Sequence, residues 1–456
     1  MASTEMRIAI FGGGFSGAMV ATHLLRLATV PLSIDLIEPR PSLGAGLAYS
    51  TANSRHVLNV PARRMSAFPD DPEHFLRWLI QHGNHHADSF APRERYGAYV
   101  RAVLETAIAD APAHARLEWI RSEASAVLSE GSSAVIRLKN GESLRADRVV
   151  LALGNFPPSD PPGADRTFYR SKHYVSHAWG PEALEALEPN VPVLLIGSGL
   201  TMLDVVLALQ ARDHQGVIHV ISRHGLLAQA YQSHPPYPSF LPMAVTSTTL
   251  RALLRRIRRE VARAAAAGHD WRAVIDALRP QIPALWQALP LAEQQRFLRH
   301  LRPYWDAHHH RVAPEAIAVL DRLRRSQQLQ IHAGRIQAYQ EQREGVRVAY
   351  RPRRSGALVD LQVSRIINCT GFECDYRRLR QPLIVNLLES GLIRPDPLYL
   401  GLDTDAEGRL LDAEGRASSL LHTLGPPCKG RLWETTAVPE IRGQAEALAR
   451  CLLQTF

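Results

Sequence analysis

Apolar and small residues near the N-terminus follow the order strand, turn, helix, strand. Residues 7–11 form an apolar run typical of a buried strand, and a glycine-rich segment, 12–17, follows at once. Residues 18–27 then show the apolar periodicity of a helix, and residues 33–37 form the next strand. No proline interrupts the predicted helix, so this pattern predicts a βαβ unit.

The same pattern returns in the middle of the chain. Residues 191–196 predict a strand, Gly197-Ser198-Gly199 a turn, 200–210 a helix and 217–221 a second strand. The two copies are too long and too far apart for a short tandem repeat. They therefore predict two nucleotide-binding domains and not a solenoid.

The remaining pattern divides the chain further. Residues 248–325 are rich in Ala, Leu and Arg at helical spacing, strand-like runs return at 328–336, 346–350 and 358–368, and a helix begins near Glu440. We therefore expect an α/β fold with two Rossmann-like dinucleotide-binding domains and a helical insertion. The expected bounds are 1–165 with 365–456 for the first domain, 166–225 with 326–364 for the second domain, and 226–325 for the insertion.

The first turn matches the dinucleotide fingerprint, with Gly12, Gly14 and Gly17 at the required spacing. The first glycine permits a tight turn, the second admits a pyrophosphate, and the third lets the helix pack on the sheet. Glu38 ends the second strand, where a carboxylate accepts hydrogen bonds from a ribose 2′-OH. A glycine-rich turn without a ligand is the alternative, but the strand, the helix and the acidic residue all favour a dinucleotide.

The second turn is a weaker match, because Met202 stands in place of a third glycine. Its second strand ends in Ser222-Arg223-His224, with no acidic residue. A guanidinium at this position suits the 2′-phosphate of NADPH better than a bare ribose. The alternative is that Arg223 is one more solvated arginine, so NADH and NADPH both stay open.

Composition narrows the class of protein. The 456 residues carry 53 Lys+Arg against 44 Asp+Glu, a net charge of +9, yet lysine occurs only at Lys139, Lys172 and Lys429. We attribute this arginine bias to coding preference and expect no nucleic-acid partner, because the arginines alternate with acidic and apolar residues and no aromatic interleaving accompanies them. Glycines and prolines interrupt the two long uncharged stretches, 8–25 and 224–250, so we expect a soluble, cytoplasmic protein without a membrane segment.

Cysteines and histidines do not form a convincing site. Cys369 and Cys374 have the spacing of a redox dithiol but follow a returning strand, so we interpret both as structural. His308, His309 and His310 are consecutive and would diverge by about 100° on a helix. We therefore expect no metal site.

Further segments carry a family resemblance. Besides 8–17 with Glu38, they are residues 44–49, 56–62, 67–72, 301–306 and 433–442. With these segments the chain resembles the FAD/NAD(P)-binding flavoprotein monooxygenases that include the bacterial FAD-dependent urate hydroxylase of the second, non-homologous type and L-aspartate N-monooxygenases. The resemblance implies that the first domain is an FAD domain and the second an NAD(P) domain. It also implies reduction of FAD by NADH or NADPH, followed by O2 activation and transfer of one oxygen atom to a small molecule.

The resemblance also implies cofactor contacts outside the glycine turns. The expected positions are Phe15, Ser16, Gly46, Asn59, Gly371 and Glu434. Because the flavin carries the chemistry, no catalytic side chain is assigned. The segment 231–242, rich in proline and aromatic residues, is either a lid over the site or a rigid connector.

Three functions follow from these observations. The leading one is urate hydroxylation to 5-hydroxyisourate. The second is N-hydroxylation of an amino acid such as L-aspartate, which an arginine-lined site for carboxylates would favour. The third is a redox sensor that binds flavin and NAD(P)H without turnover. The sequence does not indicate the oligomeric state.

Overall fold

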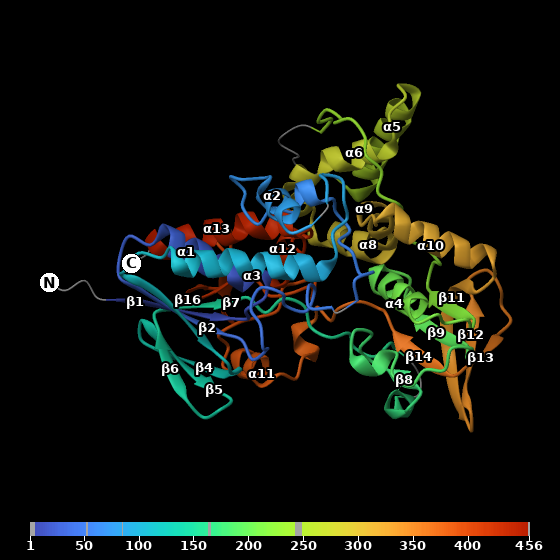
Figure 1. Cartoon of the computed structure of the whole chain (residues 1–456), viewed down its shortest axis with the longest axis horizontal. Coiled ribbons are helices and arrows are strands. Elements are labelled where there is room, and N and C mark those ends of the chain that lie inside the picture. The colour runs from blue at the N-terminus through green and yellow to red at the C-terminus, as the bar shows by residue number, and fades with distance from the viewer. Residues whose placement is uncertain (1–4, 52, 84, 163–165, 242–248, 455–456) are drawn as a thin grey trace.

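The computed structural model of the chain describes residues 5–51, 53–83, 85–162, 166–241 and 249–454. Two mixed sheets lie side by side along the long axis of the molecule (Figure 1). The strands and helices that sequence patterning predicted for both βαβ units are present, and the expected fold class is confirmed.

The first sheet has six strands in the order β15-β16-β7-β1-β2-β3. Their bounds are β1 (Met6–Phe11), β2 (Leu32–Ile37), β3 (Ala115–Ile120), β7 (Arg148–Leu151), β15 (Arg409–Leu411) and β16 (Ala417–Thr423). All neighbours pair in parallel except β15 with β16. Every residue of β2 is buried, as expected for a parallel strand covered on both faces.

Helices and a small sheet sandwich this first sheet. Helices α1 (Phe15–Leu27), α3 (Arg93–Ala109) and α13 (Val438–Gln454) share one apolar core with β1 and β2. The opposite face packs on α11 (Pro382–Glu389) and on an antiparallel sheet of β4 (Ala124–Glu130), β5 (Ser133–Leu138) and β6 (Ser143–Ala146). Beside them, α2 (His74–Gln81) packs against α3. Residues from both ends of the chain thus build one unit.

The second sheet has seven strands in the order β13-β12-β11-β10-β9-β14-β8. Their bounds are β8 (Tyr174–Val175), β9 (Val193–Ile196), β10 (Ile218–Ser222), β11 (Leu329–Gln342), β12 (Gly345–Pro352), β13 (Val359–Val363) and β14 (Arg365–Asn368). Strands β8 to β11 and β14 are parallel, and β11 to β13 form an antiparallel meander. Helices α4 (Leu200–Ala211) and α10 (Pro314–Arg325) cover one face.

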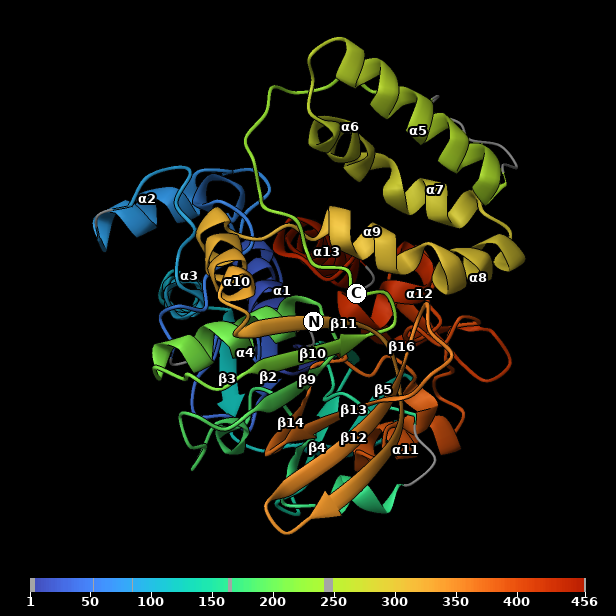
Figure 2. The same cartoon turned by 90° about the vertical axis from the view of Figure 1, so that its right-hand side faces the viewer.

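Within the described residues, five α-helices follow β10 in the chain and precede α10, and they form a separate layer. It contains α5 (Leu250–Ala266), α6 (Trp271–Leu278), α7 (Ile282–Ala288), α8 (Leu291–His300) and α9 (Arg302–His309). Figure 2 shows α5, α6 and α7 at the top, with α8 and α9 between them and the sheets. The layer packs through Trp286 onto Trp433, next to α12 (Lys429–Leu432), with ring centroids 4.9 Å apart.

The domain bounds expected from sequence stay predictions, but two elements fall differently from them. Helix α10, placed in the insertion, packs against α4 and β11 and supplies Leu320 and Leu323 to the core of the second unit. Strand β14, placed with the FAD domain, pairs with β9 in the second sheet. The helical layer proper is therefore α5 to α9.

Candidate functional site

The first glycine turn has the geometry of a dinucleotide cradle. Gly12 has φ of +103°, and a Cβ there would lie 2.5 Å from the carbonyl oxygen of Ala152. A Cβ at Gly17 would overlap the carbonyl oxygen of Gly12, so the helix starts as close to the turn as glycine allows. Gly14 lies against Gly46, whose Cα would be 3.2 Å from a Cβ at Gly14. The glycines hold the turn open where a pyrophosphate would lie.

The start of α1 completes this cradle. Gly14 is the N-cap and supplies no side-chain hydrogen bond, so the first N–H groups of the helix remain for an anion. Phe15 and Ser16 begin the helix, and both are buried. Gly425, from the C-terminal segment, lies beside Ser16, with 3.2 Å between its Cβ position and the Ser16 hydroxyl oxygen.

Glu38 lies under the turn and is 2% exposed. Its carboxylate accepts the Gly13 N–H at 2.8 Å and the Nε and backbone N–H of Arg40 at 2.9 and 3.0 Å. Burial alone would raise the pKa of Glu38, but the hydrogen bonds and charge of Arg40 lower it below its ordinary value. The group therefore stays ionised, as a ribose acceptor must be.

The second turn differs at its second glycine. Gly197 has φ of +106°, and a Cβ there would overlap the carbonyl oxygen of Cys369. Gly199 caps α4 with φ of −86°, and nothing lies within 4 Å of its Cβ position. Met202, at the third position, is buried. Backbone atoms of the protein thus fill the space beside Gly197, whereas the space beside Gly199 holds no atom of the described residues.

Positive charge gathers where β10 ends. The Nδ1 of His224 lies 2.6 Å from a guanidinium nitrogen of Arg353. Burial, followed by the charges of Arg353, Arg223 and Arg335, lowers the pKa of His224. The charges of three arginines therefore act on His224, next to the one arginine, Arg223, that the sequence indicated. Sequence analysis did not find Arg335 and Arg353, because they come from strands far along the chain from β10. Arg335 lies in β11, just after the residues that pair with β10, and Arg353 directly follows β12.

A cavity of about 1090 Å³ joins this cationic cluster to the helical layer. The residues that line it belong to the second glycine turn, the end of β10, the turn at Thr370 and Gly371, and one face of α9. Gly371 has φ of +95° and no atom within 4 Å of its Cβ position. Asn59, by contrast, lies half-buried in the bend after Leu58 and does not line this cavity.

Glu434 forms its hydrogen bonds with the helical layer. The indole N–H of Trp305 donates to its Oε1 at 2.7 Å, and the Nε2 of His310 lies 3.5 Å from its Oε2. Burial would raise the pKa of Glu434, but His310, His309 and Trp305 lower it well below its usual range. The side chain that we assigned to a cofactor thus anchors α9 to the C-terminal segment.

His309 and His310 approach the same carboxylate, so the expectation that neighbouring histidines diverge is wrong for this pair. Helix α9 ends at His309, and His310 is its C-cap residue, outside the regular helix. Ligand atoms of both histidines and Glu434 lie within 4.8 Å of one another. We interpret the group as a hydrogen-bonding cluster, because the charges of Arg279 and Arg311 reach His309 and disfavour a further cation.

The cysteines form no disulfide bond in the structure. All four are free, and Cys369 is buried beneath the second glycine turn. Burial raises the pKa of Cys369 well above its ordinary range, so its thiol stays protonated. Tyr231, at the start of the predicted lid or connector, contacts both Arg63 and Phe90, whereas Pro242 lies outside the described residues.

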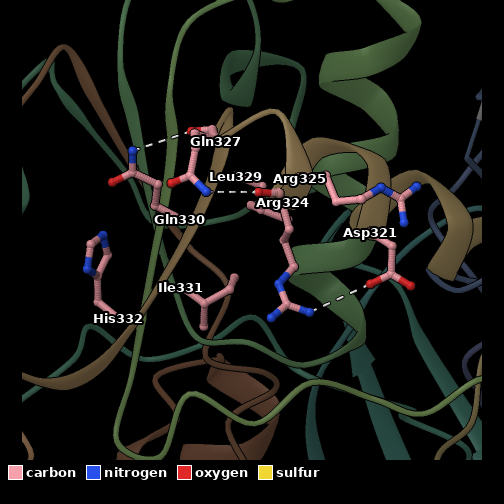
Figure 3. A pocket seen from close by; sticks show the side chains of 8 residues that line it. All are labelled: Asp321, Arg324, Arg325, Gln327, Leu329, Gln330, Ile331 and His332. Atoms are coloured by element: carbon pink, nitrogen blue, oxygen red, sulfur yellow. Dashed lines mark hydrogen bonds and ion pairs between the residues drawn. The ribbon is translucent and has the colours of Figure 1, made fainter.

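A smaller hollow of about 590 Å³ lies between α10 and β11 (Figure 3). Its charged residues are Asp321, Arg324 and Arg325. Arg324 pairs with Asp321 at 3.6 Å, and both side chains are about half exposed. The hollow includes none of the residues predicted for a site, and we assign it no ligand.

Comparison with known proteins agrees with this geometry. Residues 9–156 match the family model described as FAD-NAD(P)-binding. The chain is an FAD- and NAD(P)-binding protein. The matched segment of this flavoprotein begins in β1 and includes the first glycine turn, Glu38 and β7.

Two curated relatives are L-aspartate N-monooxygenases (nitrosuccinate-forming). The one from Streptomyces davaonensis is 25% identical in an alignment 252 residues long that covers 45% of this chain and 38% of the relative. The one from Streptomyces cremeus is 26% identical in an alignment 249 residues long that covers 45% of this chain and 37% of the relative. The similarity thus spans well under half the length of either relative.

Solved structures share the whole fold at low identity. L-lysine 6-monooxygenase from Pseudomonas syringae superposes with a TM-score of 0.67 at 18% identity, covering 99% of both chains. Ornithine hydroxylase from Pseudomonas aeruginosa gives 0.64 at 17%, also over 99% of both chains. Thioredoxin reductase from T. acidophilum gives 0.52 at 10% over the same share.

None of the helices in the described part of the flavoprotein is long and apolar enough to cross a membrane.

Proposed function

We propose that this flavoprotein is an NAD(P)H-consuming monooxygenase that hydroxylates the nitrogen of an amino acid, with L-aspartate as the first candidate. The observation that carries the proposal is the cavity in which the second glycine turn, Gly371 and the face of α9 meet. It is slightly larger than the roughly 300–1,000 Å³ usual for one small ligand, which leaves room for a coenzyme and a substrate. When bound, FAD supplies the oxygen chemistry, and the chain binds, orients and excludes water.

We base the proposed substrate on the curated relatives, and it replaces urate, the substrate that the sequence analysis favoured. Both curated relatives act on L-aspartate by their names, and no comparison supports urate as the substrate. The three arginines at the end of β10 favour NADPH over NADH, because a 2′-phosphate needs several charge-assisted donors.

A substrate-stimulated oxidation screen tests this function. Purified protein loaded with FAD is mixed with NADPH or NADH, and with L-aspartate, L-ornithine, L-lysine or urate. We expect L-aspartate to accelerate NADPH oxidation several-fold and to yield a hydroxylamine product. Acceleration by urate alone, with loss of urate absorbance, would overturn the amino-acid assignment. Acceleration by no substrate would favour a redox sensor.

The coenzyme preference has its own variant. Arg223→Gln is expected to raise the KM for NADPH about tenfold or more and to leave the KM for NADH nearly unchanged, since about 1.5–3 kcal/mol is typical for a hydrogen bond to a charged group. Arg255→Gln, on the exposed face of α5, is the matched control. Equal effects of Arg223→Gln on both coenzymes would contradict the assignment of a 2′-phosphate to this cluster.

A further inference from the structure

One face of α9 presents three polar side chains to the coenzyme cavity. Arg302, Asp306 and His310 all line it and are spaced by four residues, so they follow one face of the helix. Their side chains are 39%, 39% and 37% exposed. The other side of α9 is buried, with Trp305 and His309 turned towards Glu434.

The polar groups on this face are close but not tightly paired. The Nε of Arg302 lies 3.5 Å from Asp306 Oδ2, and the Nδ1 of His310 lies 3.9 Å from Asp306 Oδ1. The Nε2 of His310 lies 3.5 Å from Glu434 Oε2. The two separations from Asp306 exceed the usual 2.7–3.2 Å of a protein hydrogen bond, and the hydrogen bond from His310 to Glu434 is a long one, so these groups keep capacity for a ligand.

The charges around His310 come from three sides. Asp306 lies on its own helix, and Glu434 comes from the C-terminal segment. The ring of His309 lies 5.1 Å away, and burial lowers its pKa to about 3, so it is neutral near pH 7. Arg311 and Arg279 lie behind His309 and interact with it. Each ring nitrogen of His310 thus faces one carboxylate, Nδ1 that of Asp306 and Nε2 that of Glu434.

We propose that this face of α9 is the substrate site, where Arg302 holds a carboxylate of an acidic amino acid and His310 accepts a proton from its ammonium group. The inference rests on the proposed function. In the proton transfer, one N–H bond of the ammonium breaks, the proton forms a bond to a ring nitrogen of His310, and the electron pair stays on the amine. No oxidant or reductant takes part in this step. The neutral amine then has the lone pair that oxygen transfer to nitrogen requires.

His310→Gln tests the proton acceptor, with His308→Gln as the matched control on the same helix. His308 is exposed and lies outside the cavity residues. We expect His310→Gln to slow hydroxylamine formation at pH 7 by about 100-fold, the lower range for general base catalysis. The lost rate should return by about tenfold per pH unit as the free amine becomes available in solution. His308→Gln should keep the rate and the pH profile of the parent.

Arg302→Gln tests the carboxylate anchor, with Arg299→Gln on the exposed face of α8 as its control. We expect the KM for L-aspartate to rise about tenfold or more, as for loss of a charge-assisted hydrogen bond, with a smaller change in kcat. The KM for L-alanine, which lacks the second carboxylate, should rise less than that for L-aspartate if the side-chain carboxylate is the one bound.

The outcomes separate this inference from the proposed function. If the parent protein hydroxylates L-aspartate and His310→Gln keeps both its rate and its pH profile, the proton acceptor is wrong while the function stands. If Arg302→Gln leaves the KM for L-aspartate unchanged, the anchor is wrong. If the parent protein hydroxylates no amine, the function and this inference fall together.

Discussion

Gly197 and Gly199 stand two residues apart and are glycines for different reasons. A Cβ at Gly197 would overlap the carbonyl oxygen of Cys369, and its φ is +106°, so any side chain there strains the fold. Gly199 has φ of −86° and nothing within 4 Å of its Cβ position. Packing within the described residues does not require glycine at Gly199, and the close approach of a coenzyme is the reason that we expect for it.

This contrast yields a prediction at the residue scale. Gly199→Ala is expected to leave the melting temperature unchanged and to raise the KM for NADPH at least about tenfold, because the methyl group occupies the path of the pyrophosphate. Gly197→Ala is expected to lower the melting temperature itself. Thermal unfolding and steady-state kinetics on both variants check this. An unchanged KM in Gly199→Ala would remove the second turn from the coenzyme site.

The sequence predicted contacts between residues that are near one another in the chain, but not contacts between residues that are far apart in it. The glycines at 12, 14 and 17 and Glu38 belong to one βαβ unit, so their spacing alone placed them together. Arg335, Arg353 and the pairing of His310 with Glu434 depend on strands and helices far apart in sequence. No periodicity within one segment reports such contacts.

At the scale of elements, a buried ion pair joins the two nucleotide-binding units. Arg93, at the start of α3, donates to both carboxylate oxygens of Asp204 in α4, at 2.7 and 3.0 Å. The Asp204 side chain is 4% exposed and that of Arg93 is 16% exposed. The Nε2 of His56 also lies 3.0 Å from the Asp204 carbonyl oxygen. This clamp fixes one unit against the other.

Removing one partner of the clamp is expected to destabilise the protein. Arg93→Met should lower the free energy of unfolding by about 3–5 kcal/mol, because it leaves a buried carboxylate unpaired. The double variant Arg93→Met with Asp204→Leu should recover much of this loss, since no charge is then buried. Denaturant titrations measure both. Arg416→Ala, which breaks an exposed pair with Asp412, is the control and should leave the midpoint nearly unchanged. A single variant as stable as that control would contradict the clamp.

Patterning predicted the elements that carry the glycine turns but not those that link them. The apolar runs at β1, β2, β9 and β10 are strong because parallel strands are buried on both faces. The antiparallel strands β4 to β6 are partly exposed, and α3 has a mixed surface, so neither produced a clear signal. Helix α10 looked like part of the insertion because its composition matches α5 and only its packing differs.

At the scale of the whole molecule, buried histidines make stability depend on pH. Burial lowers the pKa of His23, His219 and His422 from 6.5 to about 4, and that of His309 to about 3. The unfolded chain therefore binds these protons at a higher pH than the folded chain does. Stability should fall as the pH drops from 6.5 towards 4, by about 1.4 kcal/mol per pH unit for each histidine.

Three carboxyl groups oppose this trend, because burial raises the pKa of Asp35, Asp396 and Glu440. Burial raises the pKa of Asp396 to about 6, so its protonation stabilises the folded state as the pH falls below that value. The four histidines outweigh these carboxyl groups, and the melting temperature should decline from pH 6.5 to pH 4. His422→Gln should flatten the decline. A melting temperature that is constant or rises over this range would contradict the burial of these imidazoles.

The central claim is that this flavoprotein transfers one oxygen atom from O2 to the nitrogen of an acidic amino acid. The most direct measurement is mass spectrometry of the products formed from L-aspartate and NADPH under isotope-labelled O2. We predict an N-hydroxylated product that carries one labelled oxygen atom and forms only when FAD, NADPH and the amino acid are all present. Oxidation of NADPH that yields peroxide, with no label in any amino acid, would contradict the claim.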